Sequence, residues 1–345
     1  MTCLVVACRA TTASAPTTAA IMPGPGPRIP SRDAEANDAC VGCHADVATS
    51  WRGSLHARAF VDDVFQRAFA IEPLAFCRDC HAPERGAAKG DDPTREALGV
   101  ACVTCHDPAG RGEVLAAPRD ARQAATRSPH AVRREAAFAT AAACVGCHDF
   151  PFPDVEARGH DGLRMQRTAG EHLASPFAGA SCAACHMPKD ASAGGARGHG
   201  FSVAGDEALL RDALDAHATR DGERVVVDLA PRRVGHAFPT GDLFRRLLVV
   251  AEVVGDDWQL FAHAERALGR SFAFVPSAAG TMVQRETRDD RLVGPTRLTL
   301  DLSPNARGRD IAWRVEWQRV LGARDGQAVI GGTVVLASGR LPGTP

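Results

Sequence analysis

A five-residue pattern, Cys-x-x-Cys-His, occurs five times between residues 40 and 186 of the chain. Its copies read CVGCH, CRDCH, CVTCH, CVGCH and CAACH, and together they hold ten of the twelve cysteines. Because the chain has only 13 histidines in 345 residues, a histidine directly after each of these cysteine pairs is no accident of composition. Whatever group engages these thiols and imidazoles therefore decides how this region folds.

This pattern is the attachment signature of c-type haem, in which both thiols form thioethers and the histidine binds the iron as proximal ligand. Zinc sites also use cysteine pairs, but pairs would have to share metals and the five histidines would be unexplained. A disulfide framework predicts no histidine at a fixed offset. The sequence therefore predicts five covalently attached haem c groups. The thioether cysteines are Cys40, Cys43, Cys77, Cys80, Cys102, Cys105, Cys144, Cys147, Cys182 and Cys185, and the proximal ligands are His44, His81, His106, His148 and His186.

The segment that holds the five motifs is poor in the side chains that form protein cores. Aromatic residues make up 5% of the chain, and tyrosine is absent. Residues 35–218 are rich in Ala, Gly, Arg and Pro, and such a segment could not build a conventional core from its side chains. Five porphyrins would supply the missing apolar surface. We therefore expect this domain to be unfolded without haem.

The second half of the chain has a different pattern. From Arg224 onward, short β-rich runs such as RVVVDLAP and RLLVVAEVV alternate with Gly, Pro and Asp turns, which is typical of an antiparallel β-sandwich. Upstream, Thr49–Phe69 and Asp206–His217 are predicted to be helices. The predicted fold class is α+β, a mainly α and loop haem domain with little regular structure followed by the sandwich. The expected divisions are a disordered export or tether segment (1–34), the pentahaem domain (35–218) and the β-sandwich (219–345).

The N-terminal segment bears on location. Thioether formation takes place outside the bacterial cytoplasm, so we expect export to the periplasm or outer cell envelope of a bacterium. Val5-Val6-Ala7-Cys8 resembles a lipoprotein cleavage site, which makes Cys8 a candidate for lipidation, although the preceding apolar run is short and has no basic region. The alternative is that Cys3 and Cys8 have no function. No apolar run is long enough to span a membrane, so a lipid anchor is the only membrane attachment expected.

The formal net charge of −1 bears on partners. It omits the haem propionates, and no basic patch indicates nucleic acid as a partner. We expect redox proteins of the cell envelope instead. The sequence carries no signal for an oligomeric state.

Eight histidines outside the motifs are candidates for the sixth iron position. His56 follows Trp51 on a predicted helix, His130 follows Ser-Pro, and His199 lies in a Gly-rich loop. His236 precedes a Pro-Thr-Gly turn that would project it from the sandwich toward the haems. These four are the expected distal ligands, and His160 and His172 compete for the fifth place. His217 and His263 are interpreted as ordinary exposed or core residues, and the distal partner of the fourth haem, beside His148, is not assigned.

Several further motifs resemble one family. They are Trp51, Ser54 and His56 after CVGCH, SPH (Ser128–His130), MQRT (Met165–Thr168), CHMP (Cys185–Pro188), RGHGF (Arg197–Phe201) and GHAFPTG (Gly235–Gly241). Residues 38–250 resemble the multihaem cytochromes related to the tetrahaem protein that accepts electrons from hydroxylamine oxidoreductase. The resemblance implies a pentahaem member with a C-terminal β-rich domain. The family consists mostly of electron carriers, with some catalytic relatives.

Electron transport through closely packed, mostly bis-histidine haems is the expected function. The short segment between Cys77 and Cys102 is expected to hold the second and third haems near contact. The first alternative is an oxidoreductase that acts on a small nitrogen or sulfur oxyanion at one open iron, at the fourth haem. Absence of a Cys-x-x-Cys-Lys motif is against the pentahaem nitrite reductase pattern. The second alternative is a structural haem wire or a subunit of a larger complex.

Overall fold

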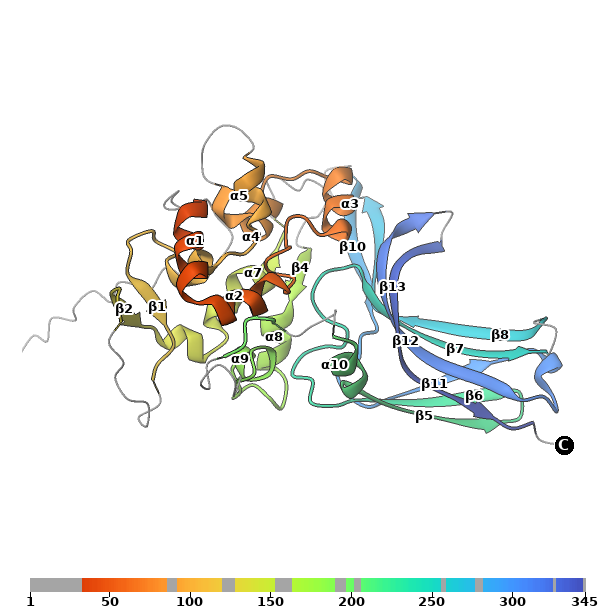
Figure 1. The fold of residues 1–345 in the computed structure, drawn as a ribbon. Coiled ribbons are helices and arrows are strands. Elements are labelled where there is room, and N and C mark those ends of the chain that lie inside the picture. Colours follow the sequence, from red (N-terminus) through yellow and green to blue (C-terminus); the bar gives the residue numbers. More distant parts are fainter. Residues whose placement is uncertain are drawn as a thin grey trace, which may run out of the picture.

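The computed structural model has two parts that lie side by side, a helical part with the five motifs and a β-rich part (Figure 1). Cys8 and His160 lie outside the residues that it describes. None of the described helices has the length and apolarity needed to cross a membrane. The structure describes residues 33–85, 92–119, 128–152, 163–189, 197–201, 206–255, 259–276, 282–324 and 327–343.

Every motif lies on or at the end of a short helix. Because residues three apart are neighbours on a helix surface, this conformation turns both cysteines of a motif to one side. The histidine then follows at the end of the helix, or directly after it in the first motif. The motif helices are α1 (Asp33–Cys43), α4 (Cys77–His81), α6 (Cys102–His106), α7 (Ala142–His148) and α9 (Cys182–His186).

Short elements connect these helices, and few large apolar side chains are buried among them. One small cluster consists of Phe76, Phe152 and Leu163. The scarcity of such residues agrees with the expectation that side chains alone do not form the core here. The connecting elements are α2 (Ala45–Arg52), α3 (Asp63–Ile71), α5 (Pro93–Ala97), α8 (Thr168–Leu173), β1 (Val114–Ala116), β2 (Val132–Arg134), β3 (Asp149–Pro151), β4 (Arg164–Arg167) and the 3₁₀ turns Pro83–Arg85 and Ala136–Ala139.

Two of the helices expected from the sequence differ in the structure. The segment Thr49–Phe69 is not one helix, because α2 ends at Arg52 and α3 begins at Asp63. Asp62 is the N-cap of α3, and its carboxylate accepts hydrogen bonds from the backbone N–H groups of Val64 (3.1 Å) and Phe65 (3.2 Å). Such a cap residue has extended backbone and ends any helix that precedes it.

The helix predicted over Asp206–His217 is also too long. Helix α10 spans Glu207–Asp212, and strand β5 (Leu214–Asp221) follows at once. Strand β5 therefore begins before the predicted domain boundary at residue 219. Its apolar residues are sparse, which concealed its pairing with the strand that follows it in the chain.

Seven strands form two antiparallel sheets. One sheet has the order β11-β6-β5 and the other β13-β12-β7-β8. Alternate residues of β6, Val225, Val227 and Leu229, share one hydrophobic core with Val249 of β7 and Val315 of β12, so the two sheets enclose a common interior. We call Leu214–Leu341 the β-domain. The strands not yet given are β6 (Arg224–Pro231), β7 (Arg245–Val254), β8 (Leu260–Leu268), β11 (Thr296–Asp301), β12 (Ile311–Arg324) and β13 (Gln327–Leu341).

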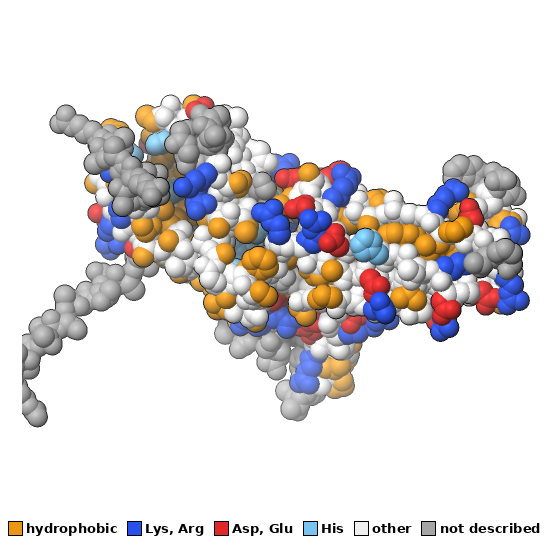
Figure 2. All heavy atoms as spheres, turned by 90° about the horizontal axis from the view of Figure 1, so that it is seen from below, with side chains coloured by type: hydrophobic (Ala, Val, Ile, Leu, Met, Phe, Trp, Pro, Cys, Tyr) orange, Lys and Arg blue, Asp and Glu red, His pale blue; other side chains and the backbone are white. Residues whose placement is uncertain are grey.

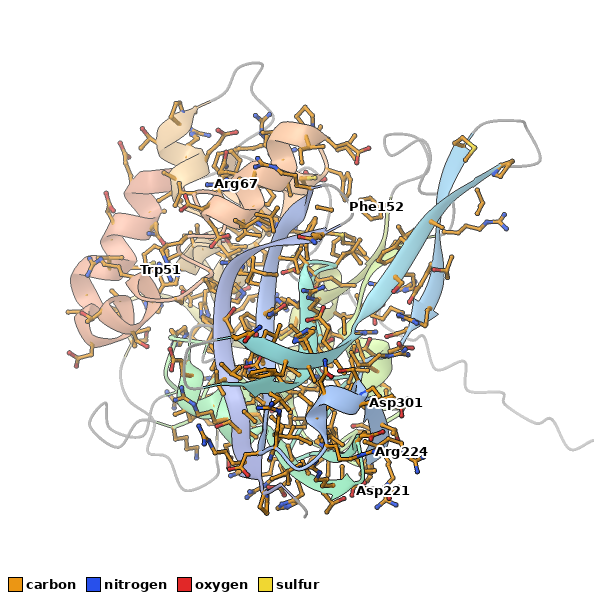
Figure 3. All side chains as sticks on the ribbon, turned by 90° about the vertical axis from the view of Figure 1, so that its right-hand side faces the viewer. Trp51, Arg67, Phe152, Asp221, Arg224 and Asp301 are labelled. Carbon is orange, nitrogen blue, oxygen red and sulfur yellow. The ribbon has the colours of Figure 1, made fainter. Side chains whose placement is uncertain are left out.

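A hairpin of β9 (Arg270–Pro276) and β10 (Met282–Asp289) reaches from the β-domain to the helical part. Arg270 donates hydrogen bonds to the backbone carbonyls of Met165 (2.9 Å) and Arg164 (2.7 Å) in β4. Figure 3 shows Phe152 near this hairpin. Phe272 of β9 packs against the apolar cluster that contains Phe152. The sequence did not reveal β10, because its residues MVQRETRD are mostly polar.

A second contact between the two parts joins α3 to β12. Arg319 of β12 forms a bidentate ion pair with Asp62, at 2.6 and 3.2 Å. On the face shown in Figure 2, positive and negative side chains lie close together, with no large patch of one sign. Both contacts fix the β-domain against the haem-binding helices.

Candidate haem-binding centres

Four of the five motif histidines face a second histidine from elsewhere in the chain. In each case the partner is one of the four distal ligands expected from the sequence. The distances between ring centres are 6.4 Å for His44 and His130, 6.1 Å for His106 and His199, 6.1 Å for His148 and His56, and 6.1 Å for His186 and His236.

These separations fit one iron between two imidazoles. A bond between a metal and an imidazole nitrogen is about 2 Å long, and each nitrogen lies about 1 Å from the centre of its ring, so that two such ligands place their ring centres roughly 6 Å apart. Two rings stacked face to face in direct contact lie closer together, as Phe65 and His81 do at 3.7 Å. The residues present therefore fit bis-histidine haem.

Hydrogen bonds at Nδ1 support the same interpretation. The Nδ1–H group of His106 donates to the carbonyl of Leu115 (2.6 Å), and that of His199 donates to the carbonyl of Arg197 (2.9 Å). Histidines that bind a metal usually donate their other N–H in this way, which fixes the tautomer and leaves Nε2 for the metal. The same arrangement holds for His81 with Ala59 (2.7 Å), His148 with the side chain of Gln166 (3.2 Å) and His236 with Ala237 (3.0 Å).

The surroundings keep these imidazoles neutral, which is the form that binds metal. Burial lowers the pKa of His56 to about 3, and the neighbouring histidines, His148 first, add to the shift. Burial also lowers the pKa of His106, His148 and His236, against the opposing effect of their hydrogen bonds. Protonation near neutral pH would therefore not compete with an iron for these rings.

His56 is positioned by the residues around it in the sequence motif. The indole N–H of Trp51, labelled in Figure 3, donates to the carbonyl of Val100 (2.9 Å), and the N–H of Val100 donates to the carbonyl of His56 (2.8 Å). Gly99 has a φ of +57°, and a Cβ at this residue would lie 2.5 Å from the carbonyl oxygen of His56. The close approach of the two segments thus depends on a glycine at residue 99.

The second motif differs from the other four. Among the described histidines, none has its ring opposite His81, and Phe65 instead stacks on the His81 ring with an angle of 11° between the planes. The sequence left the fourth motif without a distal partner. The structure pairs the histidine of that motif, His148, with His56, and it is the iron site of the second motif that lacks a described partner.

His172 does not face a motif histidine. Its Nδ1 lies 2.9 Å from the carbonyl oxygen of Gly235, and its Nε2 lies 2.9 Å from that of Ala180. Both ring nitrogens are thus engaged by the backbone, which is against the expectation that His172 is a distal ligand. His160, the other candidate, lies outside the described residues. His217 lies on β5 and His263 on β8, away from the motifs.

The motifs lie close to one another in a definite order. Asn37, beside the first motif, accepts a hydrogen bond from the backbone N–H of Cys102 in the third (2.9 Å). The thiols of Cys144 and Cys182 lie within hydrogen-bonding range, which places the fourth motif beside the fifth. His148 also interacts with His81, so the second motif neighbours the fourth. The second motif also lies beside the third, because the hydroxyl of Thr104 donates to Glu84, three residues after His81 (2.8 Å). The expected close contact between the second and third haems stays a prediction.

Sequence reasoning did not find the residues that hold the His236 loop. Glu171 of α8 and Arg291 of the β-domain form a 2.5 Å ion pair beside this loop. A single carboxylate on a short helix and a single arginine after a strand have no pattern that distinguishes them from other charged residues.

Comparisons with known proteins agree with this geometry. Residues 39–107, which hold the first three motifs, match the family model of cytochrome c554 and c-prime. The fold is similar to that of a penta-heme cytochrome c552 from Thermochromatium tepidum, with a TM-score of 0.63, 18% sequence identity, and coverage of 88% of this chain and 98% of that chain. No curated protein matches the chain. These findings confirm the resemblance to the multihaem cytochromes c, and they show that the chain has the fold of a pentahaem cytochrome.

Proposed function

We propose that the chain is an electron carrier with five covalent haem c groups, four of them bound by two histidines. The observation that carries this proposal is the set of four histidine pairs at 6.1–6.4 Å, with Nδ1 of several of these rings already hydrogen-bonded. The haem would supply reversible one-electron chemistry at each iron. The protein holds both imidazoles of each pair, and two histidine ligands favour a low reduction potential and electron transfer over reaction with substrate.

The order of the motifs supports transport across the molecule. The first motif lies at the end away from the β-domain, near β1 and β2, where His44 and His130 are exposed (Figure 1). The third, fourth and fifth motifs follow toward the β-domain, and His236 of the β-domain reaches the fifth. This series offers electrons a continuous route, with exchange with a redox partner protein at the exposed end.

A periplasmic or outer-envelope location is part of the proposal. It is supported by the five motifs, because haem attachment to them requires export. Lipidation at Cys8 would hold the protein at a membrane surface, and membrane fractionation of parent and Cys8→Ala would test it. Release of the variant into the soluble fraction supports the anchor, and an unchanged distribution contradicts it.

A second candidate function is reduction or oxidation of a small nitrogen or sulfur oxyanion at the iron that His81 would bind. The observation that favours it is that the ring of His81 has no described histidine opposite it. Carbon monoxide added to the reduced parent tests this, because it binds only an iron with an open position. Binding of one equivalent per chain supports the candidate. Binding to His160→Ala but not to the parent would instead assign His160 as the fifth distal ligand.

The haem count tests the main proposal directly. Pyridine haemochrome analysis of the exported protein, combined with its intact mass, should give five covalent haems per chain. Two or fewer would contradict the proposal. Redox titration should show centres over a broad low range, whereas uniformly high potentials would indicate methionine ligands.

A further inference from the structure

The loop that carries His236 belongs to the β-domain, but side chains of the helical part hold it. Three residues of α8 contact it: Thr168, Glu171 and His172. The Nδ1–H group of His172 donates to the carbonyl of Gly235 (2.9 Å), the residue before His236. A Cβ at Gly235 would lie 2.9 Å from this Nδ1, so the close seating requires a glycine there.

Glu171 holds the other side of the loop. Its Oε2 accepts hydrogen bonds from the backbone N–H of Ala237 (3.2 Å), directly after His236, and from the hydroxyl of Thr240 (2.7 Å). The hydroxyl of Thr240 also lies 3.1 Å from that of Thr168. The peptide groups on both sides of His236 are thus fixed by neighbouring residues of one helix.

Arg291 holds the carboxylate of Glu171 in place. Its guanidinium donates to Oε1 of Glu171 (2.5 Å) and to Asp289 (2.9 Å), and its side chain is 4% exposed. Burial alone would lower the pKa of Arg291, but Asp289 and Glu171 raise it. Because both oxygens of Glu171 accept from different donors, an amide at this residue would point its NH₂ group at another donor.

We propose that Glu171 is a positioning residue for the iron of the fifth motif, because it fixes the loop that presents His236 opposite His186. The inference rests on the proposed function, in which His236 is the distal ligand. A buried hydrogen bond to a charged group contributes about 1.5–3 kcal/mol, so loss of this anchor should raise the population of the dissociated loop roughly tenfold to a hundredfold.

The test compares haem-loaded variants by carbon monoxide binding and by high-spin absorbance. His236→Ala should bind one more equivalent of carbon monoxide per chain than the parent. Glu171→Ala should bind the same additional equivalent at a rate at least tenfold above the parent, since the gas captures the dissociated state. Glu171→Gln should fall between the parent and Glu171→Ala.

The matched control is Arg319→Ala, which breaks a different ion pair between the two parts, the one with Asp62, and leaves the His236 loop untouched. Its spectrum and carbon monoxide binding should equal those of the parent. If Arg319→Ala has the same effect as Glu171→Ala, Glu171 merely joins the two parts and the inference is wrong.

The outcomes separate the inference from the proposed function. If His236→Ala binds no additional carbon monoxide, His236 is not a ligand and this part of the proposed function fails. If it does bind while Glu171→Ala behaves as the parent, only the positioning role fails. If Glu171→Ala does not fold, Thr240→Val replaces it in the test, because this variant removes the hydroxyl that donates a hydrogen bond to Glu171. A carbon monoxide rate above the parent supports the inference, and a parental rate overturns it.

Discussion

Replacement of Gly99 by alanine should displace His56 from its partner His148. Gly99 has a φ of +57°, and a Cβ there would lie 2.5 Å from the carbonyl oxygen of His56 and 2.7 Å from that of Ala57. A left-handed conformation costs a residue other than glycine roughly 1–2 kcal/mol. Relief of the clash would also break the hydrogen bond from Val100 to His56, worth about 1 kcal/mol. The expected total is about 2–3 kcal/mol.

Gly222 provides the matched control, since its φ is +63° but no atom lies within 4 Å of a Cβ built on it. Gly222→Ala should therefore cost only the backbone strain. Guanidinium unfolding and the visible spectrum of the haem-loaded proteins measure both effects. Gly99→Ala should unfold at the lower denaturant concentration and show one additional high-spin haem, whereas Gly222→Ala should keep the parental spectrum. Equal stability and an unchanged spectrum in Gly99→Ala would refute this account of how His56 is positioned.

Three further predictions concern folding, acid and haem load. Without haem maturation, proteolysis should digest the helical part but leave a fragment of the β-domain, which has its own hydrophobic core; equal resistance of both parts would be evidence against this. Burial alone would raise the pKa of Asp289, but Arg291 and then Arg167 lower it. The carboxylate of Asp289 therefore stabilises the fold above about pH 4, and this contribution is lost as the pH falls below that value. Unfolding curves at several pH values should therefore show a weaker acid dependence in Asp289→Asn than in the parent, and parallel curves would contradict the shift. Changing both Cys182 and Cys185 to serine should lower the covalent haem count from five to four, and an unchanged mass of attached haem would reject the fifth motif as an attachment site.

The local parts of this protein were predictable from the sequence and the long-range parts were not. A Cys-x-x-Cys-His motif is a single turn of helix, so its residues determine its geometry and its chemistry without reference to the rest of the chain. Which distal histidine meets which motif depends on the packing of distant segments. His56 lies shortly after the first motif, yet its ring faces His148 of the fourth.

The same limit explains the errors at the boundary of the β-domain. Strand β5 follows α10 directly, and its residues LDAHATRD resemble the end of an amphipathic helix when read alone. Only pairing with β6 makes it a strand. Likewise His172 competed with His160 for the fifth distal place in the sequence, and the structure is against His172 because both of its ring nitrogens lie against backbone carbonyls.

The central claim is that four histidine pairs bind iron, and spectroscopy in a magnetic field tests this claim most directly. Electron paramagnetic resonance and near-infrared magnetic circular dichroism of the fully oxidised protein count low-spin haems with two histidine ligands. At least four such centres per chain should be found, matching the pairs of His44, His106, His148 and His186 with their partners. Fewer than four, or methionine as the second ligand at any of these irons, would contradict the account.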